Sequence, residues 1–115
     1  MVYTYTLKAL PKDKTAYLNV LSAQVVEWHH DKHQAGYVTK LNEINQKLAS
    51  FDKAGANANY SDWSDAKRRE TFNKAGIVLH ENYWEVFGSD GKYTDSLSVV
   101  KKLVTDFGSM ENWMS

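Results

Sequence analysis

The sequence predicts an all-α fold, a long antiparallel helical hairpin followed by a short third helix, and two observations support this. First, two long stretches repeat apolar or imidazole side chains every three or four residues, the spacing that places side chains on one face of a helix. Second, the segment between them, residues 52–61, is rich in small and polar residues, as is typical of a connector. Two helices joined in this way run antiparallel. Over the 115 residues we expect an N-terminal arm and hairpin domain at 1–92, and the start of a truncated or missing C-terminal domain at 93–115.

The first 20 residues are expected to form an extended arm, because they hold the only proline, Pro11, with a short turn near residues 13–17. Ser22 is a suitable N-cap for the first helix, which then continues to about Ser50. Such a helix would be roughly 40 Å long at 1.5 Å per residue. Its predicted inner stripe consists of Val25, His29, His33, Tyr37, Leu41, Ile44 and Leu48.

The second helix is expected over about 62–87, ending in the turn residues 89–91. A third helix is expected over about 95–106, and Ser109 would cap a further helix start. The inner stripe of the second helix consists of Phe72, Gly76, His80 and Trp84. The apolar stripe residues expected in the core are Leu41, Ile44, Leu48, Phe72 and Trp84.

Two histidines from different helices are predicted to meet. His29 lies 21 residues before the expected end of the first helix, and His80 lies 18 residues after the expected start of the second. In an antiparallel pair these positions differ in height by roughly 5 Å. Gly76, one turn before His80, removes a side chain from the seam, so that the backbones can approach or a partner's side chain can enter. The pair indicates either a metal site or two hydrogen-bonded core histidines.

A metal would need more than two imidazoles, because manganese or iron takes about five or six ligands, commonly with a carboxylate among them. Glu27, Asp31 and Glu81 are the nearby carboxylates, but each lies off the predicted stripes. The remaining ligands would therefore come from solvent, a second copy or another chain. His30 and Asp31 are expected on the exposed surface of the first helix.

The composition excludes several classes of function. Fourteen basic and fourteen acidic residues give a formal net charge of zero, which argues against nucleic-acid or anionic-membrane partners. The chain has no cysteine, so any metal must be held by imidazole and carboxylate donors, which suit manganese, iron or zinc. No stretch has the length of a membrane span and the N-terminus lacks a signal peptide, so we expect a cytoplasmic protein.

Three strings of the sequence resemble motifs of the iron/manganese superoxide dismutases. HHDKHQAGYV at 29–38 resembles the first-helix signature HHxKHxxxYV, and FNKAGIVLHENYW at 72–84 resembles the second signature, FNxAGxxxHxxxW. DFGSMENW at 106–113 resembles the DFGSFENW with which the family's C-terminal domain begins. The three motifs occur in the family's order, and the resemblance implies the fold of that family's N-terminal domain.

The resemblance also implies roles for particular residues. His29 and His80 correspond to metal ligands for Mn or Fe, and His33 and Tyr37 to the catalytic gateway pair that lines substrate access. Trp84 corresponds to an aromatic wall of the pocket. The implied reaction is disproportionation of superoxide.

The sequence departs from the family in two respects. The family takes an aspartate and a histidine ligand from a D-x-W-E-H motif of its C-terminal domain, and this sequence has no such motif. Gly76 stands where iron-type members often carry glutamine, which favours a manganese-type or unselective site.

Three hypotheses follow from this partial match. In the first, the chain forms a homodimer that completes the site, with Tyr37, Trp84 and Phe87 supplying apolar contact between the copies. In the second, a separate chain supplies the C-terminal half. In the third, the chain is a non-catalytic helical interaction module that kept only the scaffold.

Overall fold

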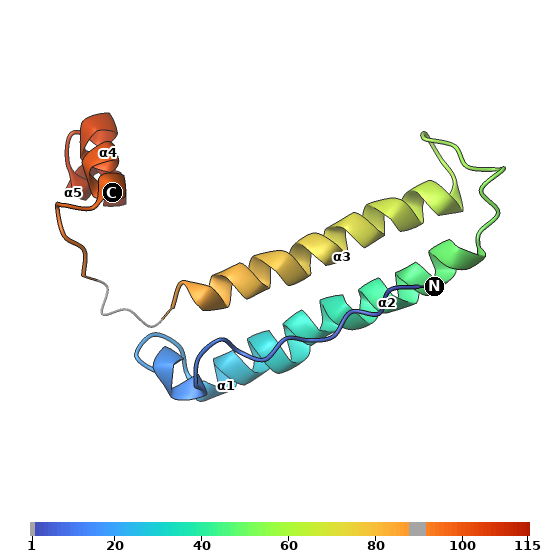
Figure 1. The fold of residues 1–115 in the computed structure, drawn as a ribbon, viewed down its shortest axis with the longest axis horizontal. Coiled ribbons are helices and arrows are strands. Elements are labelled where there is room, and N and C mark those ends of the chain that lie inside the picture. The colour runs from blue at the N-terminus through green and yellow to red at the C-terminus, as the bar shows by residue number, and fades with distance from the viewer. Residues whose placement is uncertain (1, 88–91) are drawn as a thin grey trace.

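The computed structural model describes residues 2–87 and 92–115, and over these ranges every regular element is a helix or helical turn. The hairpin consists of two long rods that run antiparallel (Figure 1). The all-α prediction is confirmed, whereas the turn predicted at residues 89–91 lies outside the described ranges. The elements in chain order are η1 (Lys14–Tyr17), α1 (Ala23–Glu27), η2 (Trp28–Gln34), α2 (Ala35–Ser50), α3 (Asp62–Glu85), α4 (Ser98–Phe107) and α5 (Met110–Met114).

Serine side chains cap three of the helices, and those at Ser22 and Ser109 were predicted from the sequence. Ser22 accepts a hydrogen bond from the Val25 amide at 3.2 Å and begins the first rod. Ser61 and Ser64 form a reciprocal capping box that begins α3. Ser109 accepts from the Asn112 amide at 3.0 Å and begins α5. The second helix ends two residues earlier than predicted, and the third begins three residues later.

The first rod is not a regular α-helix throughout. Between α1 and α2 the backbone forms the π-helical segment η2, in which the hydrogen bonds span five residues instead of four. This segment contains three of the four histidines. The sequence pattern predicted an uninterrupted α-helix here, because over only seven residues a four-residue step between side chains fits either conformation.

Over residues 25–38 the buried face of the first rod is displaced by one residue from the predicted stripe, and the two agree again at Leu41. Val25 is 41% exposed, whereas its neighbour Val26 is fully buried. The predicted members His29 and Tyr37 are only half-buried, on the flank of the buried face. The buried residues of this rod are Val26, His30, Gln34, Val38 and Leu41.

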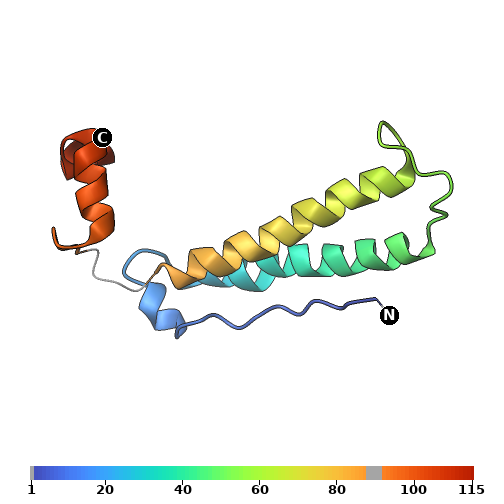
Figure 2. The ribbon, with the colours of Figure 1, turned by 45° about the horizontal axis from the view of Figure 1, so that its top comes forward.

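The N-terminal arm explains this displacement. It runs extended beside the first rod (Figure 2), as the sequence predicted, and its polar groups bond to that rod. The Asn42 side chain bonds both the amide and the carbonyl of Tyr5, at 2.8 and 2.9 Å, and His30 Nε2 lies 2.9 Å from the Lys8 carbonyl oxygen. Lys12 Nζ donates to the carbonyls of Glu85 and Phe87, beside the C-terminal end of α3. The arm therefore covers one face of the first rod while α3 covers another.

Two apolar clusters hold the hairpin together. The first contains buried Tyr17, Val26 and Trp84, with Tyr83 and Phe87 packed against it. Trp84 and Phe87 thus pack within the hairpin of their own chain, and they do not form the exposed dimer contact that was predicted from the sequence. The second cluster contains the buried residues Val38, Leu41 and Ile77, with Tyr5, Leu7 and Tyr37 packed against it.

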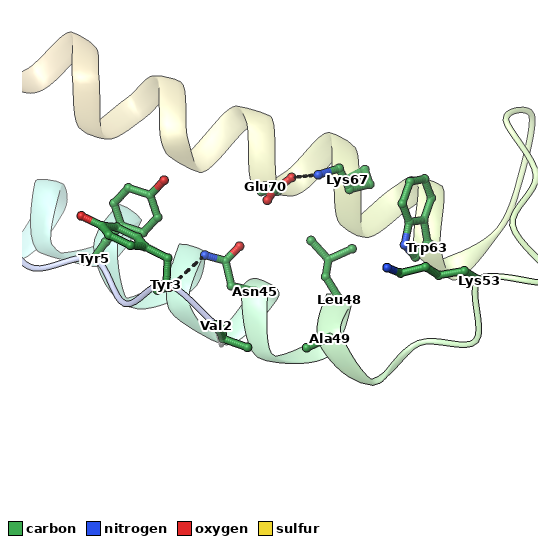
Figure 3. Close-up of a pocket in the computed structure, with 10 residues that line it drawn as sticks. All are labelled: Val2, Tyr3, Tyr5, Asn45, Leu48, Ala49, Lys53, Trp63, Lys67 and Glu70. Atoms are coloured by element: carbon green, nitrogen blue, oxygen red, sulfur yellow. Dashed lines mark hydrogen bonds and ion pairs between the residues drawn. The ribbon is translucent and has the colours of Figure 1, made fainter.

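The core predictions hold for Leu41 and Trp84 but not for Phe72. Phe72 is 66% exposed, and its ring lies 5.9 Å from that of Tyr37, centroid to centroid. Ile44 and Leu48 are half-buried. Near the connector the rods and the arm leave an open pocket beside Leu48 (Figure 3). It is lined by Val2, Tyr3, Tyr5, Asn45, Leu48, Ala49, Lys53, Trp63, Lys67 and Glu70.

The C-terminal helices form a unit of their own. α4 packs against α5 and, within 2–87 and 92–115, against no element of the hairpin. Gly108, at φ 83°, ends α4 in a backbone conformation that favours glycine. No helix of the part described here is long and apolar enough to cross a membrane.

Candidate metal centre

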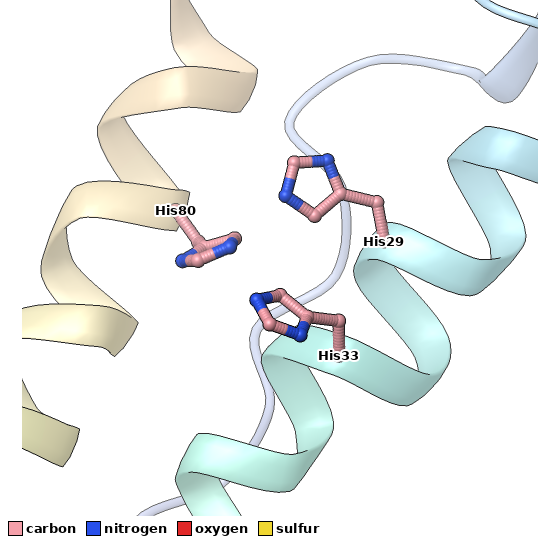
Figure 4. A group of neighbouring side chains, drawn as sticks. All are labelled: His29, His33 and His80. Atoms are coloured by element: carbon pink, nitrogen blue, oxygen red, sulfur yellow. The ribbon is translucent and has the colours of Figure 1, made fainter.

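Three histidine rings converge between the two rods. His29 and His33 project from η2 and His80 projects from α3 (Figure 4). The His29 and His80 ring centroids are 4.8 Å apart, those of His33 and His80 are 5.1 Å apart, and those of His29 and His33 are 5.7 Å apart. One ring nitrogen from each histidine lies within 4.8 Å of the others. The predicted meeting of His29 and His80 is therefore present, and His33 joins the pair.

A backbone hydrogen bond orients the His80 ring. His80 Nδ1 lies 2.6 Å from the carbonyl oxygen of Gly76, one turn earlier in α3. A carbonyl only accepts, so Nδ1 carries the proton and donates. The lone pair of the neutral ring is then on Nε2, and this is the arrangement that a metal-binding histidine commonly has.

The His29 ring lies in a largely aromatic setting. Tyr83 and Trp84 pack against it at centroid distances of 5.0 and 5.2 Å. Burial, followed by repulsion from the neighbouring His80 and His33 rings, lowers the pKa of His29 below its usual value of 6.5. The environment thus favours the neutral imidazole, which is the form that binds metals.

His33 and Tyr37 both lie beside His80. His33 is exposed, and its ring is 5.1 Å from that of Tyr37. Tyr37 is half-buried and its ring is 5.3 Å from that of His80.

Gly76 makes room for Tyr37. A Cβ added to Gly76 would lie 2.7–2.8 Å from three ring atoms of Tyr37. The sequence suggested that this gap would admit a close backbone or a partner's side chain. The structure corrects this expectation, because an aromatic ring of the same chain fills the gap.

Gln34 is a residue of this region that the sequence patterns did not indicate. It is almost fully buried, and its Oε1 accepts a hydrogen bond from Trp84 Nε1 at 2.8 Å. Trp84 in turn packs on His29. Gln34 lies one helical turn after His30, on the same face of the rod. Because the sequence analysis placed His30 on the surface, this spacing did not indicate that Gln34 is buried.

His30 is buried, which corrects its predicted place on the exposed surface. Nε2 is bonded to the Lys8 carbonyl, and Nδ1 lies 2.5 Å from Oδ1 of Asp31. Both ring nitrogens therefore have protein partners and neither is available to a metal. Asp31 is exposed as predicted, and its hydrogen bonds with His30 and then Lys14 lower its pKa below 3.8.

The nearby carboxylates do not join the cluster. Asp31 bonds His30 and Lys14, and Glu81 accepts from Lys8 Nζ at 2.6 Å. Among the described residues, the metal-competent group contains His29, His33 and His80 only. Three convergent imidazoles fit a transition-metal ion, since imidazole suits zinc, copper, iron and nickel. They supply only part of the coordination that a manganese or iron site requires.

The fold and the cluster together define a class of protein, a helical hairpin whose two rods bring histidines into one metal-competent group. Comparison with known families identifies which family has this hairpin. Residues 4–88 match the family model described as iron/manganese superoxide dismutases, alpha-hairpin domain. The chain belongs to this family.

Individual relatives agree with this assignment. The iron superoxide dismutase of Aquifex aeolicus is 40% identical over 109 residues, covering 90% of this chain and 51% of the relative. Manganese superoxide dismutase 2 of Halobacterium salinarum is 37% identical, covering 95% and 53%. The iron enzyme of Synechococcus elongatus is 32% identical, covering 97% and 56%. The chain thus spans about half the length of the curated relatives it matches.

Proposed function

We propose that this chain is a metal-binding member of the superoxide dismutase family, in which His29 and His80 bind Mn or Fe. The observation that carries the proposal is the 4.8 Å separation of these two rings across the hairpin. Burying two imidazoles in an apolar seam destabilises the folded protein unless each ring has a polar partner. A metal ion bound by both rings would be a partner for each. His80 is already held by its bond to Gly76 with Nε2 free.

His33 and Tyr37 are proposed as the gateway to the ion, where superoxide would enter. Their support is the exposure of His33 and the contact of both rings with His80, at centroid distances of 5.1 and 5.3 Å. The phenol and the imidazole can each carry a proton to or from a small anion. A bound manganese or iron ion would supply one-electron redox chemistry.

The further donors of the site are proposed to come from another polypeptide, and a second copy of this chain is the simplest source. An apolar stripe along α3 and its C-cap supports self-association. Phe72 and Leu79 of α3 and the C-cap residue Val86 are spaced by seven residues, close to two helical turns, and are 66%, 66% and 76% exposed. Phe72 touches Tyr37, so this stripe borders the site.

A separate chain that carries the C-terminal half is the other source of donors. The separation of α4 and α5 from the hairpin supports a boundary near residue 92, beyond which a second domain would begin. A cytoplasmic location stays a prediction.

Metal content together with mass in solution tests the proposal. We expect the purified full-length protein to contain Mn or Fe and to lose it in His29→Ala and His80→Ala. His30→Gln is the matched control, because it removes a histidine whose two nitrogens are already bonded to protein. Metal content that is unchanged in His29→Ala and His80→Ala would contradict the proposal and support a non-catalytic interaction module. A multimeric mass favours completion by a second copy, and a stable monomer argues against it.

A further inference from the structure

We propose that the open pocket near the connector binds a small aromatic carboxylate, that is, a flat ring system carrying one carboxylate group. Three parts of the chain form its walls: the N-terminal arm, the end of the first rod with the connector, and the start of α3. The pocket shares no residue with the histidine cluster, so this inference is independent of the proposed metal-binding function.

The pocket has the size of a small-molecule site. Its volume is about 340 Å³, close to the lower end of the roughly 300–1,000 Å³ that is usual for ligand pockets. Leu48 and Ala49 of α2 contribute apolar surface to its lining. A ligand of one or two rings suits a site of this volume and composition.

Aromatic side chains line both ends of the pocket. Tyr3 and Tyr5 lie at one end, with their rings edge to face at a centroid distance of 4.6 Å. Trp63 lies at the other end, and Leu48 projects between the two ends (Figure 3). Tyr3 is 70% exposed, so its ring is open to contact from outside the chain. Rings placed in this way can hold a flat aromatic ligand by stacking and edge contacts.

Hydrogen bonds hold both ends in place without a ligand. The Asn42 side chain bonds the amide and the carbonyl of Tyr5, at 2.8 and 2.9 Å, which fixes the arm to α2. Trp63 lies in the first turn of α3, where the capping box of Ser61 and Ser64 fixes the backbone. Because both walls are already ordered, a ligand loses little binding free energy in ordering them.

The charges of the pocket favour an anion. Its charged side chains are Lys53, Lys67 and Glu70, two ammonium groups against one carboxylate. Lys67 forms an ion pair with Glu70, whereas Lys53 has no hydrogen bond or ion pair within 2–87 and 92–115. The Lys53 ammonium group points toward the centre of the pocket (Figure 3). One free ammonium group matches the single charge of a carboxylate better than the nearly double charge of a phosphate group.

An NMR titration of the ¹⁵N-labelled full-length protein with naphthylacetate tests the inference, because the four tryptophans supply indole N–H reporter signals. We expect the Trp63 signal to move in a saturable way, while that of Trp113, on α5, stays in place. Naphthylethylamine has the same rings and the opposite charge, and it should bind at least about 10-fold more weakly. The absence of a saturable Trp63 shift, or equal affinity for the acid and the amine, would overturn the inference.

Two pairs of variants assign the binding to this pocket, with affinities measured from backbone amide signals. Lys53→Glu should lower the affinity for naphthylacetate about 10-fold or more, because attraction becomes repulsion. Lys47→Glu is the control, since Lys47 is an exposed lysine of α2 outside the pocket. Trp63→Ala should lower the affinity by a similar factor, with Trp113→Ala as its control.

Lys53→Glu keeps the test decisive even if Trp63→Ala fails to fold, because Lys53 is exposed in the connector. Equal naphthylacetate affinity in Lys53→Glu and the unaltered protein would overturn the inference.

Discussion

Tyr37 and Gly76 meet across the hairpin, with the Tyr37 ring in the space that a side chain at position 76 would need. The contact lies one turn from His80, whose Nδ1 donates to the carbonyl of the same glycine. Gly76 therefore serves the site twice, by admitting an aromatic ring and by orienting an imidazole. The distance between the two rods beside the cluster depends on this pair.

Replacing Gly76 with alanine should destabilise the protein. The new methyl group would lie 2.7 Å from Tyr37 Cδ1, and overpacking of this kind costs about 1–3 kcal/mol. The gain in helix propensity, about 1 kcal/mol, offsets part of this cost. We expect a net loss of about 1 kcal/mol in the free energy of unfolding, measured with a chemical denaturant.

Gly36→Ala is the matched control for that experiment. Gly36 also lies in a helix, but a Cβ there would meet nothing within 4 Å. Only the propensity term remains, so this variant should be more stable by up to about 1 kcal/mol. Equal effects of the two substitutions would show that Tyr37 does not restrict position 76.

The hydrogen bond from Trp84 to Gln34 should contribute to stability beyond its packing. Gln34→Leu leaves a buried indole donor without a partner, which costs about 1–3 kcal/mol. Gln24→Leu, at an exposed position of α1, is the control and should change stability by less than about 0.5 kcal/mol. Combining Gln34→Leu with Trp84→Phe should cost less than the sum of the single changes, and strict additivity would show that the bond contributes nothing.

The sequence was sufficient to predict the two rods, the caps at Ser22 and Ser109, and the meeting of His29 with His80. These features depend on the three- or four-residue spacing of side chains and on the rise of a helix per residue. Both can be worked out by counting residues in the sequence. The caps at Ser22 and Ser109 are equally local, because each serine bonds an amide only three residues away.

The sequence could not predict which neighbouring stripe is the more deeply buried. That depends on where the N-terminal arm packs, and its contacts with Asn42 and His30 join residues more than 20 positions apart. His30 was misplaced for this reason, and Phe72 was assigned to the core because its period continues that of Trp84. The π-helical segment was missed because nothing in residue spacing alone separates it from an α-helix.

Self-association through the α3 stripe can be tested with one charge. Leu79→Arg places a cation at the centre of the stripe formed by Phe72, Leu79 and Val86, and should lower the mass in solution to that of a monomer. Val78→Arg is the control, since Val78 is also exposed but lies about 100° away around the helix. Sedimentation would contradict this proposal if Leu79→Arg kept the mass of the unaltered protein.

The ion pair at the start of α3 predicts a pH dependence. Arg69 Nε donates to Asp65 at 2.7 Å, and this hydrogen bond lowers the pKa of Asp65 below 3.8. Because the folded pKa is the lower one, the stabilisation is complete above pH 3.8 and is lost as the pH falls through the folded pKa. The effect on stability should be small, since both side chains are exposed.

A carboxyl NMR titration checks this sign. The Asp65 midpoint should lie below 3.8 in the unaltered protein and rise toward 3.8 in Arg69→Gln. A midpoint that is the same in both proteins would mean that the hydrogen bond is not maintained in solution.

Pulsed electron paramagnetic resonance of the Mn²⁺-loaded full-length protein, with ¹⁵N placed in its histidines, tests the central claim most directly, because it detects nitrogen atoms bonded to the ion. We predict histidine-nitrogen couplings that disappear when His29 and His80 are both replaced by alanine and persist in His30→Gln. The same nitrogen couplings in all three proteins, or none in the unaltered protein, would contradict the claim that these two histidines hold the metal.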